Sequence, residues 1–76
     1  MPSRTFDPDA LRQIRLERGL TQVQLAERVG IVHTSVSLME HGRHKPSVTV
    51  LAALADTLGA PMDDFMTRAD RELVSA

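Results

Sequence analysis

Small polar side chains gather between residues 33 and 37, and they are the part of this chain best suited to hydrogen-bonding chemistry. His33 carries an imidazole ring, and Thr34, Ser35 and Ser37 carry hydroxyl groups. Each of these groups can donate or accept a hydrogen bond, as contact with the base edges or phosphate oxygens of duplex DNA requires. That chemistry becomes available if one helix presents the group on its outer face.

Two short helices within residues 22–41 are predicted to position this polar group. Apolar residues recur at helical spacing on both sides of a central glycine, with Leu25, Ala26 and Val29 before Gly30 and with Val36 and Met39 after it. The inner faces can therefore pack together. The small Ala26 side chain lets the two backbones approach, and Gly30 tolerates the positive φ that the turn needs. This is the layout of a helix-turn-helix that reads duplex DNA.

The rest of the chain predicts further helices and no strand. The first helix begins with Asp7 as its N-cap and Pro8 at the first helical position. Thr21 and Gln24 form a capping box at the start of the second helix. The fourth helix begins at Ser47 and carries the most apolar face of the chain, so it is expected at the centre of the core.

The remaining two helices have less definite starts. Val32 or His33 occupies the N-cap position of the third helix, where a hydroxyl side chain would be expected. Pro61 opens a fifth helix, in which apolar residues recur at Met62, Phe65, Met66, Ala69 and Leu73. This stripe is longer than a small core requires, so Met62, Phe65, Met66 and Leu73 are predicted to contact a second copy of the chain.

Length and composition indicate one small domain. The 76 residues are expected to form a single domain over 1–76, with its core at 8–66 and a C-terminal helical extension at 67–76. The chain has no cysteine and no apolar run typical of a secretion signal or a membrane span, which predicts a cytoplasmic location. Two phenylalanines are its only aromatic residues, which argues against base stacking on single strands or RNA.

The charge balance gives only weak support to nucleic-acid binding. Ten acidic residues slightly outnumber nine basic ones, for a net charge of −1. Their distribution is more favourable, because acidic residues gather in the C-terminal third, at Asp56, Asp63, Asp64, Asp70 and Glu72. Acidity therefore lies away from the proposed reading face.

No group of residues predicts catalysis, a cofactor or a metal site. The serines at 35 and 37 have no oriented His–Asp pair beside them, and the carboxylates are scattered along the predicted helices. His41 and His44 lie three residues apart, but no acidic or cysteine partner is suitably near. The sequence therefore predicts a binding protein rather than an enzyme.

Three stretches resemble the Cro and phage-repressor family of helix-turn-helix domains, also called xenobiotic-response-element-like. They are LRQIRLERGLTQVQLAERVG, SVSLMEHGRHKPS and LAALADTLG, in the family's order and close to its spacing. The resemblance covers roughly residues 11–66 and implies an all-α, lambda-repressor-like bundle of five helices with the third in the major groove. It implies a transcription regulator, and our first hypothesis is a repressor that binds a pseudo-palindromic operator in double-stranded DNA as a homodimer.

The resemblance implies which residues read bases. His33, Thr34, Ser37 and Leu38 match the family's base-reading positions. In these roles His33 would donate to guanine, and Thr34 and Leu38 would contact thymine methyl groups. Many family members carry glutamine, asparagine or arginine here instead, so the family does not supply the target sequence.

Phosphate contacts and one structural ion pair follow from the same resemblance. The phosphate contacts are implied for Gln22, Ser35, Arg43, His44 and Lys45, with the backbone N–H of Gly42 or Arg43 beside them. The ion pair joins Arg15 to Glu40, tying the first helix to the third and fixing how the recognition helix is presented.

Several alternatives remain open at this point. Leu38 can pack on a neighbouring helix, His33 can be an ordinary surface residue, and the apolar stripe after Pro61 can belong to the core. A second functional hypothesis is an antitoxin-like interaction module that binds a protein partner, a toxin or an effector, with DNA binding secondary. A third is that these residues are the DNA-binding part of a longer regulator.

Overall fold

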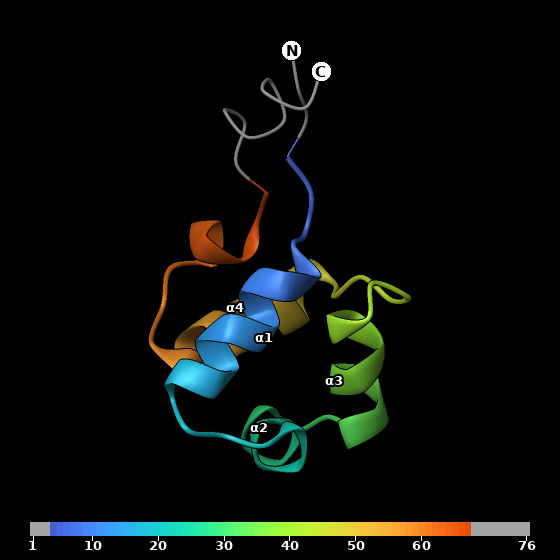
Figure 1. Ribbon diagram of the computed structural model, residues 1–76, viewed down its shortest axis with the longest axis vertical. Helices are drawn as coiled ribbons and strands as arrows, with labels where there is room; N and C mark the ends of the chain where they lie inside the picture. The colour runs from blue at the N-terminus through green and yellow to red at the C-terminus, as the bar shows by residue number, and fades with distance from the viewer. Residues whose placement is uncertain (1–3, 68–76) are drawn as a thin grey trace.

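Four α-helices and one 3-10 turn make up the regular structure of residues 4–67, which are the residues that the computed structural model describes. The elements are α1 (Pro8–Glu17), α2 (Gln22–Val29), α3 (His33–Glu40), α4 (Val48–Leu58) and the 3-10 turn η1 (Met62–Phe65). Figure 1 shows α1 in front of α4, with α2 at the bottom and α3 upright on the right. The predicted all-α class is confirmed, with four α-helices in place of five.

Side-chain caps fix the starts of three helices at the residues that the sequence predicts. The Asp7 carboxylate accepts hydrogen bonds from two backbone N–H groups in the first turn of α1. Thr21 and Gln24 form a complete capping box on α2, with N···O distances of 3.0 and 2.9 Å. The Ser47 hydroxyl accepts a bond from the third residue of α4. These bonds satisfy N–H groups that the first turn of a helix leaves unpaired, so they act locally.

The start of α3 differs because it has no side-chain cap. Val32 is its N-cap residue, with extended backbone angles, and its side chain makes no capping hydrogen bond. Contacts with the rest of the fold must therefore hold the first turn of α3, and α2 supplies the most extensive of them.

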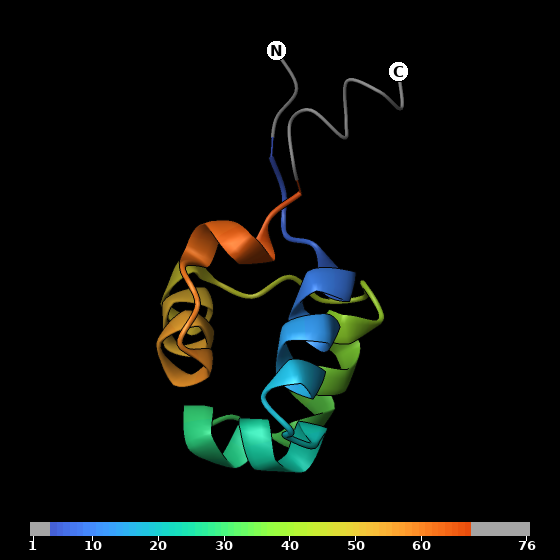
Figure 2. The ribbon, with the colours of Figure 1, turned by 60° about the vertical axis from the view of Figure 1, so that its left-hand side comes forward.

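The segment after Pro61 corrects the prediction of a fifth helix. Its helical part is the 3-10 turn η1, and the next residue, Met66, is extended with φ −111° and ψ 153°. Met66 forms an antiparallel β-bridge with Phe6, and the backbone N–H of Thr67 donates to the carbonyl of Thr5 at 2.7 Å. Because Met66 and Thr67 pair with residues near the other end of the chain, they do not continue a helix, although the apolar residues of this segment recur at helical spacing. Figure 2 shows the two segments leaving side by side at the top of the molecule.

The apolar residues of this segment divide between surface and core. Met62 is 37% exposed, whereas Phe65 is fully buried and Met66 packs partly buried against the core. The prediction that Phe65 contacts a second copy is therefore wrong, because its side chain closes the core where η1 meets α1 and α4. Leu73, in the extension predicted over 67–76, lies outside the described residues.

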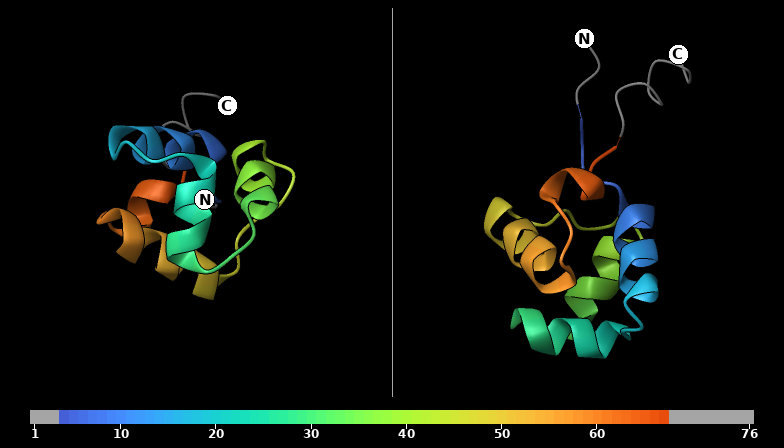
Figure 3. Two further views of the ribbon diagram at one scale, coloured as in Figure 1. Left: turned by 90° about the horizontal axis from the view of Figure 1, so that it is seen from below. Right: turned by 90° about the vertical axis from the view of Figure 1, so that its left-hand side faces the viewer.

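A single apolar core holds these elements together. Its buried members are Phe6, Leu11, Leu20, Leu25, Ala26, Val36, Met39, Leu51, Leu54, Ala55, Leu58 and Phe65. As the sequence predicts, α4 supplies the largest share, with four buried residues. Figure 3 shows α4 facing α1 across the molecule, with α2 along the lower end. This arrangement leaves α3 on one flank, attached through its inner face.

Candidate nucleic-acid interface

α3 has a buried face and an exposed face that follow the helical period. Its buried residues are Val36, Met39 and Glu40. Thr34 and Leu38, one turn apart on the opposite side, are both exposed. Leu38 is 39% exposed, so part of its surface is accessible on this side of α3. The outer face carries two of the four predicted base-reading residues at its centre.

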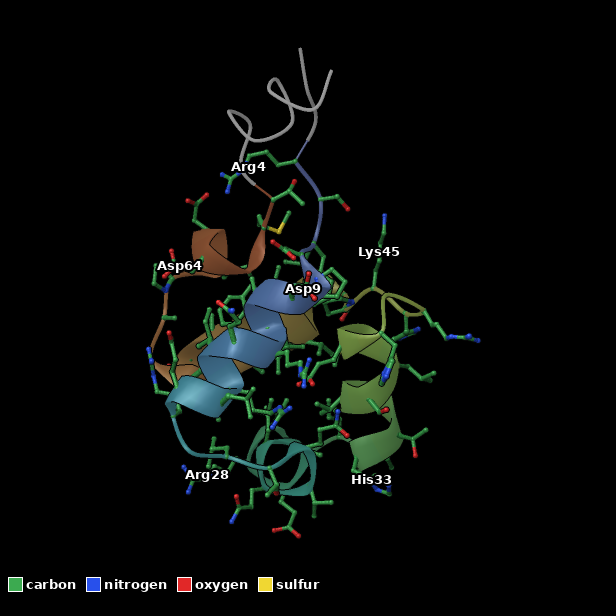
Figure 4. All side chains as sticks on the ribbon, viewed as in Figure 1. Arg4, Asp9, Arg28, His33, Lys45 and Asp64 are labelled. Atoms are coloured by element: carbon green, nitrogen blue, oxygen red, sulfur yellow. The ribbon has the colours of Figure 1, made fainter. Side chains whose placement is uncertain are left out.

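The other two predicted base readers flank this pair. His33 is exposed at the first position of α3, and Ser37 is partly exposed near its end. Figure 4 places the His33 side chain at the lower end of α3, directed away from the other helices. Among the described elements, none covers the outer side of α3 in Figure 1 or Figure 3. His33, Thr34 and Leu38 are exposed and Ser37 is partly exposed, and helical spacing puts all four on one side of α3.

The turn between α2 and α3 sets the relative position of the two helices. Ala26 is 2% exposed, and its carbonyl accepts bonds from the N–H groups of Gly30 and Ile31 at 2.8 and 3.0 Å. Gly30 closes α2 in the left-handed region, with φ 87°. A Cβ atom at this position would meet no atom within 4 Å, so the backbone angle alone favours glycine.

A buried ion pair anchors α3 to α1. The Arg15 Nε donates to Glu40 Oε2 at 2.6 Å, and its Nη2 donates to Oε1 at 2.9 Å. A third guanidinium nitrogen, Nη1, donates to the carbonyl of Leu20 at 2.8 Å. The hydrogen bonds to Glu40 raise the pKa of Arg15, against burial, which lowers it. The structure thus brings together the two residues of the implied ion pair in bidentate geometry.

Gln22 joins the same network from the first position of α2. Its Nε2 donates to Glu40 Oε1 at 3.1 Å, and the side chain is partly buried. An amide nitrogen carries two hydrogens, so the second one remains available to an incoming acceptor. The bond to Glu40 was not predicted from the sequence, and it ties the direction of the Gln22 amide to α3.

The loop after α3 presents cations but not the backbone donors that were expected beside them. Gly42 N–H donates to the carbonyl of Met39 at 3.2 Å, and Arg43 N–H donates to that of Leu38 at 2.9 Å. These groups close the end of α3, so the expectation that they contact phosphate is corrected. The side chains of Arg43 and Lys45 are exposed, and neither takes part in a salt bridge within the described part of the chain.

A groove of about 280 Å³ separates α3 from the following loop and from α4. Ser35 and Met39 line it from α3, His44 and Lys45 from the loop, and Val50 from α4. This groove beside α3 is therefore lined by three predicted phosphate contacts, Ser35, His44 and Lys45. His44 is exposed, whereas Ser35 is partly buried.

Charges are distributed unevenly around the described residues. Figure 4 shows Lys45 and His33 on the side of the molecule that carries α3, and Asp64 on the opposite side. Asp63 and Asp64 both belong to η1. Figure 4 also shows Arg4 and Arg28 on the side of Asp64, so the contrast depends on α3 itself: Arg43 and Lys45 follow it, and its own carboxylate, Glu40, is paired with Arg15. The local charge at α3 is therefore more favourable to a polyanion than the net charge of −1 indicates.

Two residues near α3 were not predicted as site residues and lie beside the exposed face. His41 follows Thr34, Ser37 and Leu38 in the i, i+3, i+4, i+7 pattern, which the sequence already contains. Its Nδ1 lies 2.7 Å from the carbonyl of Ser37, at the C-terminal end of α3. Val32 is 66% exposed directly before α3, and no pattern in the sequence distinguishes it from a core valine.

The described residues contain no candidate metal site and no candidate membrane-spanning helix. Within residues 4–67, His, Asp and Glu side chains nowhere gather in threes in a way that could hold a metal ion. None of the helices within these residues combines the length and the apolar character that crossing a membrane requires.

Comparison with known proteins finds a family model that matches this chain. The family model for a helix-turn-helix domain matches residues 9–66, which is most of the chain. An uncharacterized HTH-type transcriptional regulator from Methanothermobacter thermautotrophicus is 43% identical over 49 residues, covering 64% of this chain and 71% of that protein. The immunity repressor of Bacillus phage phi105 is 43% identical over 49 residues, covering 64% of this chain and 34% of the repressor.

The structural comparison agrees. Bacillus thuringiensis PlcR, solved in complex with the peptide PapR7 and DNA, superposes with a TM-score of 0.70 and 36% sequence identity. The match covers 76% of this chain and 20% of PlcR. This chain thus spans only about a fifth of PlcR and a third of the phage repressor, and the likeness concerns those parts alone.

Proposed function

Because the chain belongs to the family of helix-turn-helix domains, we propose that it is a sequence-specific reader of double-stranded DNA that regulates transcription. Its relatives include an HTH-type transcriptional regulator and a phage immunity repressor. We propose the repressor role on that basis, with a homodimer acting at a pseudo-palindromic operator. In such a complex the half-sites lie about 34–36 Å apart, one turn of DNA.

The observation that carries this proposal is the exposed outer face of α3 beside unpaired cations. The major groove of B-DNA admits an α-helix, and α3 lies on one flank of the molecule (Figure 3) with Thr34 and Leu38 exposed. Arg43 and Lys45 follow in the next loop, without carboxylate partners among the described residues. A helix entering the groove would bring these cations to the phosphates that border it.

The residues divide between base reading and phosphate binding. We propose that His33, Thr34, Ser37 and Leu38 face the base edges. The proposed phosphate contacts are Gln22, Ser35, Arg43, His44 and Lys45. The free N–H of the Gln22 amide suits this role because its partner, Glu40, holds the group at the N-terminus of α2, where a helix attracts anions.

The dimer contact is proposed at the end of the molecule that carries η1. Met62, the first residue of η1, is 37% exposed, and Figure 2 shows η1 at the opposite end of the molecule from α2. A dimer formed through this end would leave both copies of α3 uncovered. Light scattering with and without operator DNA would measure the stoichiometry, and one protomer per operator would contradict the dimer.

Selection of bound duplexes from a random library, followed by sequencing, tests the proposal directly. We expect enrichment of a two-fold symmetric site whose half-sites are separated by one helical turn. Affinity should also fall with salt, with a slope of log K against log[salt] near −3 to −4 if four cationic side chains of a dimer each neutralise one phosphate. A pool without an enriched sequence, together with a flat salt dependence, would contradict DNA reading and favour the antitoxin-like module.

A further inference from the structure

We propose that the groove between α3, the following loop and α4 binds a small aliphatic carboxylate, and that this ligand competes with DNA. The apolar part of the groove lining receives the aliphatic chain, and the Ser35 hydroxyl and the Lys45 ammonium group receive the carboxylate. The ligand site goes beyond the proposed function. The competition rests on that function, because Ser35 and Lys45 are also proposed phosphate contacts.

The first support is the apolar part of the groove lining. Four of the eight lining residues are apolar, and they are Ile31, Met39, Pro46 and Val50. Met39 is buried, whereas the other three are only partly buried, so the fold leaves some of their apolar surface in contact with solvent. Ligand sites are mostly lined by apolar side chains, with a few polar groups that orient the ligand. The groove has this composition.

The second support is the charge and hydrogen-bonding capacity of the polar lining. Within residues 4–67, neither the Ser35 hydroxyl nor the Lys45 ammonium group has a side-chain hydrogen bond or a salt bridge. Figure 4 shows Lys45 extended into solvent, and its flexible four-carbon stem lets the ammonium group turn toward a ligand. The lining of this part of the chain includes no carboxylate that would repel an anion. One lysine balances one negative charge, as on a carboxylate.

The third support is the volume of the groove, which limits the size of the ligand. Its 280 Å³ correspond to about nine water molecules at roughly 30 Å³ each, so it suits a ligand of about that number of non-hydrogen atoms. Sites for drug-sized ligands are larger, at about 300–1,000 Å³. Octanoate has the required size, one negative charge and an unbranched aliphatic chain, so it serves as the probe.

Ligand binding would oppose DNA binding because the two use the same donors. A carboxylate oxygen and a phosphate oxygen accept from the same hydroxyl and ammonium groups. A carboxylate in the groove therefore neutralises Lys45 and occupies Ser35, both of which line the groove. For simple competition, a ligand at a concentration equal to its own dissociation constant weakens DNA binding by about twofold per protomer.

The direct test titrates octanoate, below its micelle concentration, into the isotope-labelled 76-residue chain without DNA and follows the backbone amide resonances. We expect saturable shifts centred on Ser35, Met39, Lys45 and Val50, with a dissociation constant in the millimolar range that is usual for a ligand of this size. Hexanoate should bind more weakly, by up to about fourfold for each CH₂ group that it lacks. Octanol, which has no charge, should also bind more weakly. Shifts that do not saturate, or that centre elsewhere on the molecule, would overturn the inference.

One pair of variants tests the apolar part of the site. Val50→Phe fills the groove and should weaken octanoate binding by about tenfold, equivalent to burying nearly two fewer CH₂ groups. Val23→Phe makes the same change at an exposed valine on α2, outside the groove, and should leave octanoate binding unchanged. Circular dichroism checks that both variants fold. If Val50→Phe instead changes the association state in light scattering, a second copy of the chain covers the groove and the inference is wrong.

A second pair of variants tests the charged part and does not depend on the folding of Val50→Phe. Lys45→Gln should weaken the binding of octanoate and leave that of octanol unchanged. Arg28→Gln removes an exposed positive charge on α2, outside the groove, and should affect neither ligand. Equal octanoate affinity of Lys45→Gln and the wild type would contradict the proposed carboxylate contact.

Competition is measured separately, by fluorescence anisotropy with the duplex enriched from the random library. Octanoate should weaken DNA binding, whereas acetate at the same ionic strength should not. If octanoate binds the groove and leaves DNA affinity unchanged, the competition is wrong while the ligand site stands. If the wild-type chain binds no duplex, the proposed function fails, and the titration without DNA still decides whether the ligand site exists.

Discussion

At the scale of single residues, the ion pair between Arg15 and Glu40 ties α1 to α3, the helix that carries the proposed base-reading face. Both residues are buried, at 7% and 8% exposure, and their opposite charges compensate each other. The Leu20 carbonyl accepts a further bond from Arg15, and the Gln22 amide donates one to Glu40. Because the pKa of Arg15 is raised, the stability that it contributes is lost only as the pH rises above the ordinary guanidinium range. The guanidinium therefore stays charged throughout the neutral pH range.

Removal of Glu40 alone should destabilise the fold more than removal of both partners. Glu40→Ala leaves a buried, uncompensated guanidinium, and the expected cost is about 3–5 kcal/mol in the free energy of unfolding. Arg15→Met combined with Glu40→Leu should cost less, because no buried charge is left unpaired. Urea titration followed by circular dichroism measures both. Glu17→Gln, which removes an exposed partner 3.8 Å from Arg18, is the control and should change stability by less than about 1 kcal/mol.

The proposed phosphate contacts and the proposed base contacts predict different effects of substitution. Arg43→Gln or Lys45→Gln should weaken binding to every duplex by a similar factor. Each should also reduce the magnitude of the slope of log K against log[salt] by about one for each protomer bound. His33→Asn or Thr34→Ala should instead change which duplex binds best, by about 1–3 kcal/mol at the affected position. Competition titrations across a panel of duplexes separate the two outcomes. Arg28→Gln is the control, because Figure 4 shows Arg28 on the side away from α3.

At the scale of elements, helix starts were predictable where a local cap exists and less so elsewhere. Asp7, Thr21 and Ser47 bond to backbone groups within three residues, and such short-range bonds are readable from sequence. The segment after Pro61 has helical spacing, but its course depends on pairing with Thr5 and Phe6, which local patterns do not contain. The hydrogen bond from Gln22 to Glu40 was missed for the same reason.

The turn between α2 and α3 gives a prediction at this scale. Gly30→Ala places a Cβ atom in open space but forces an L-residue to adopt φ near 87°, so the cost is conformational. We expect a loss of about 1–2 kcal/mol in stability. Gly30→Asn should lose less, because asparagine tolerates the left-handed region better. Equal thermal stability of the alanine variant and the wild type would show that the turn can adopt another backbone conformation.

At the scale of the whole molecule, two segments far apart in sequence close the fold at one end. Asp7 N–H donates to the carbonyl of Phe65 at 2.8 Å, and Arg4 pairs with Asp63. Phe6 and Phe65, the only aromatic residues of the chain, are both buried next to this pairing. The proposed base-reading face of α3 lies elsewhere, so the residues that close the fold are separate from those proposed to contact DNA.

Substitution of Phe65 tests how much this closure contributes to the stability of the fold. Phe65→Ala removes a fully buried ring and should cost about 3–5 kcal/mol, a large part of the stability of a small domain. Leu16→Ala is the control, because Leu16 is 54% exposed on α1, outside the proposed dimer and DNA contacts, and the expected loss is much smaller. Urea titration compares the two variants. Similar midpoints would show that the ring is not needed to close the core.

The backbone bond between Thr5 and Thr67 also has a consequence for protein engineering. Because the N–H of Thr67 lies 2.7 Å from the Thr5 carbonyl, a short linker could join these positions without disturbing the core. The chain could then be opened at the turn after α4 to give a circular permutant with a new order of helices. Equally, the domain could be inserted as a cassette into a surface loop of a host protein, with α3 directed away from the graft point.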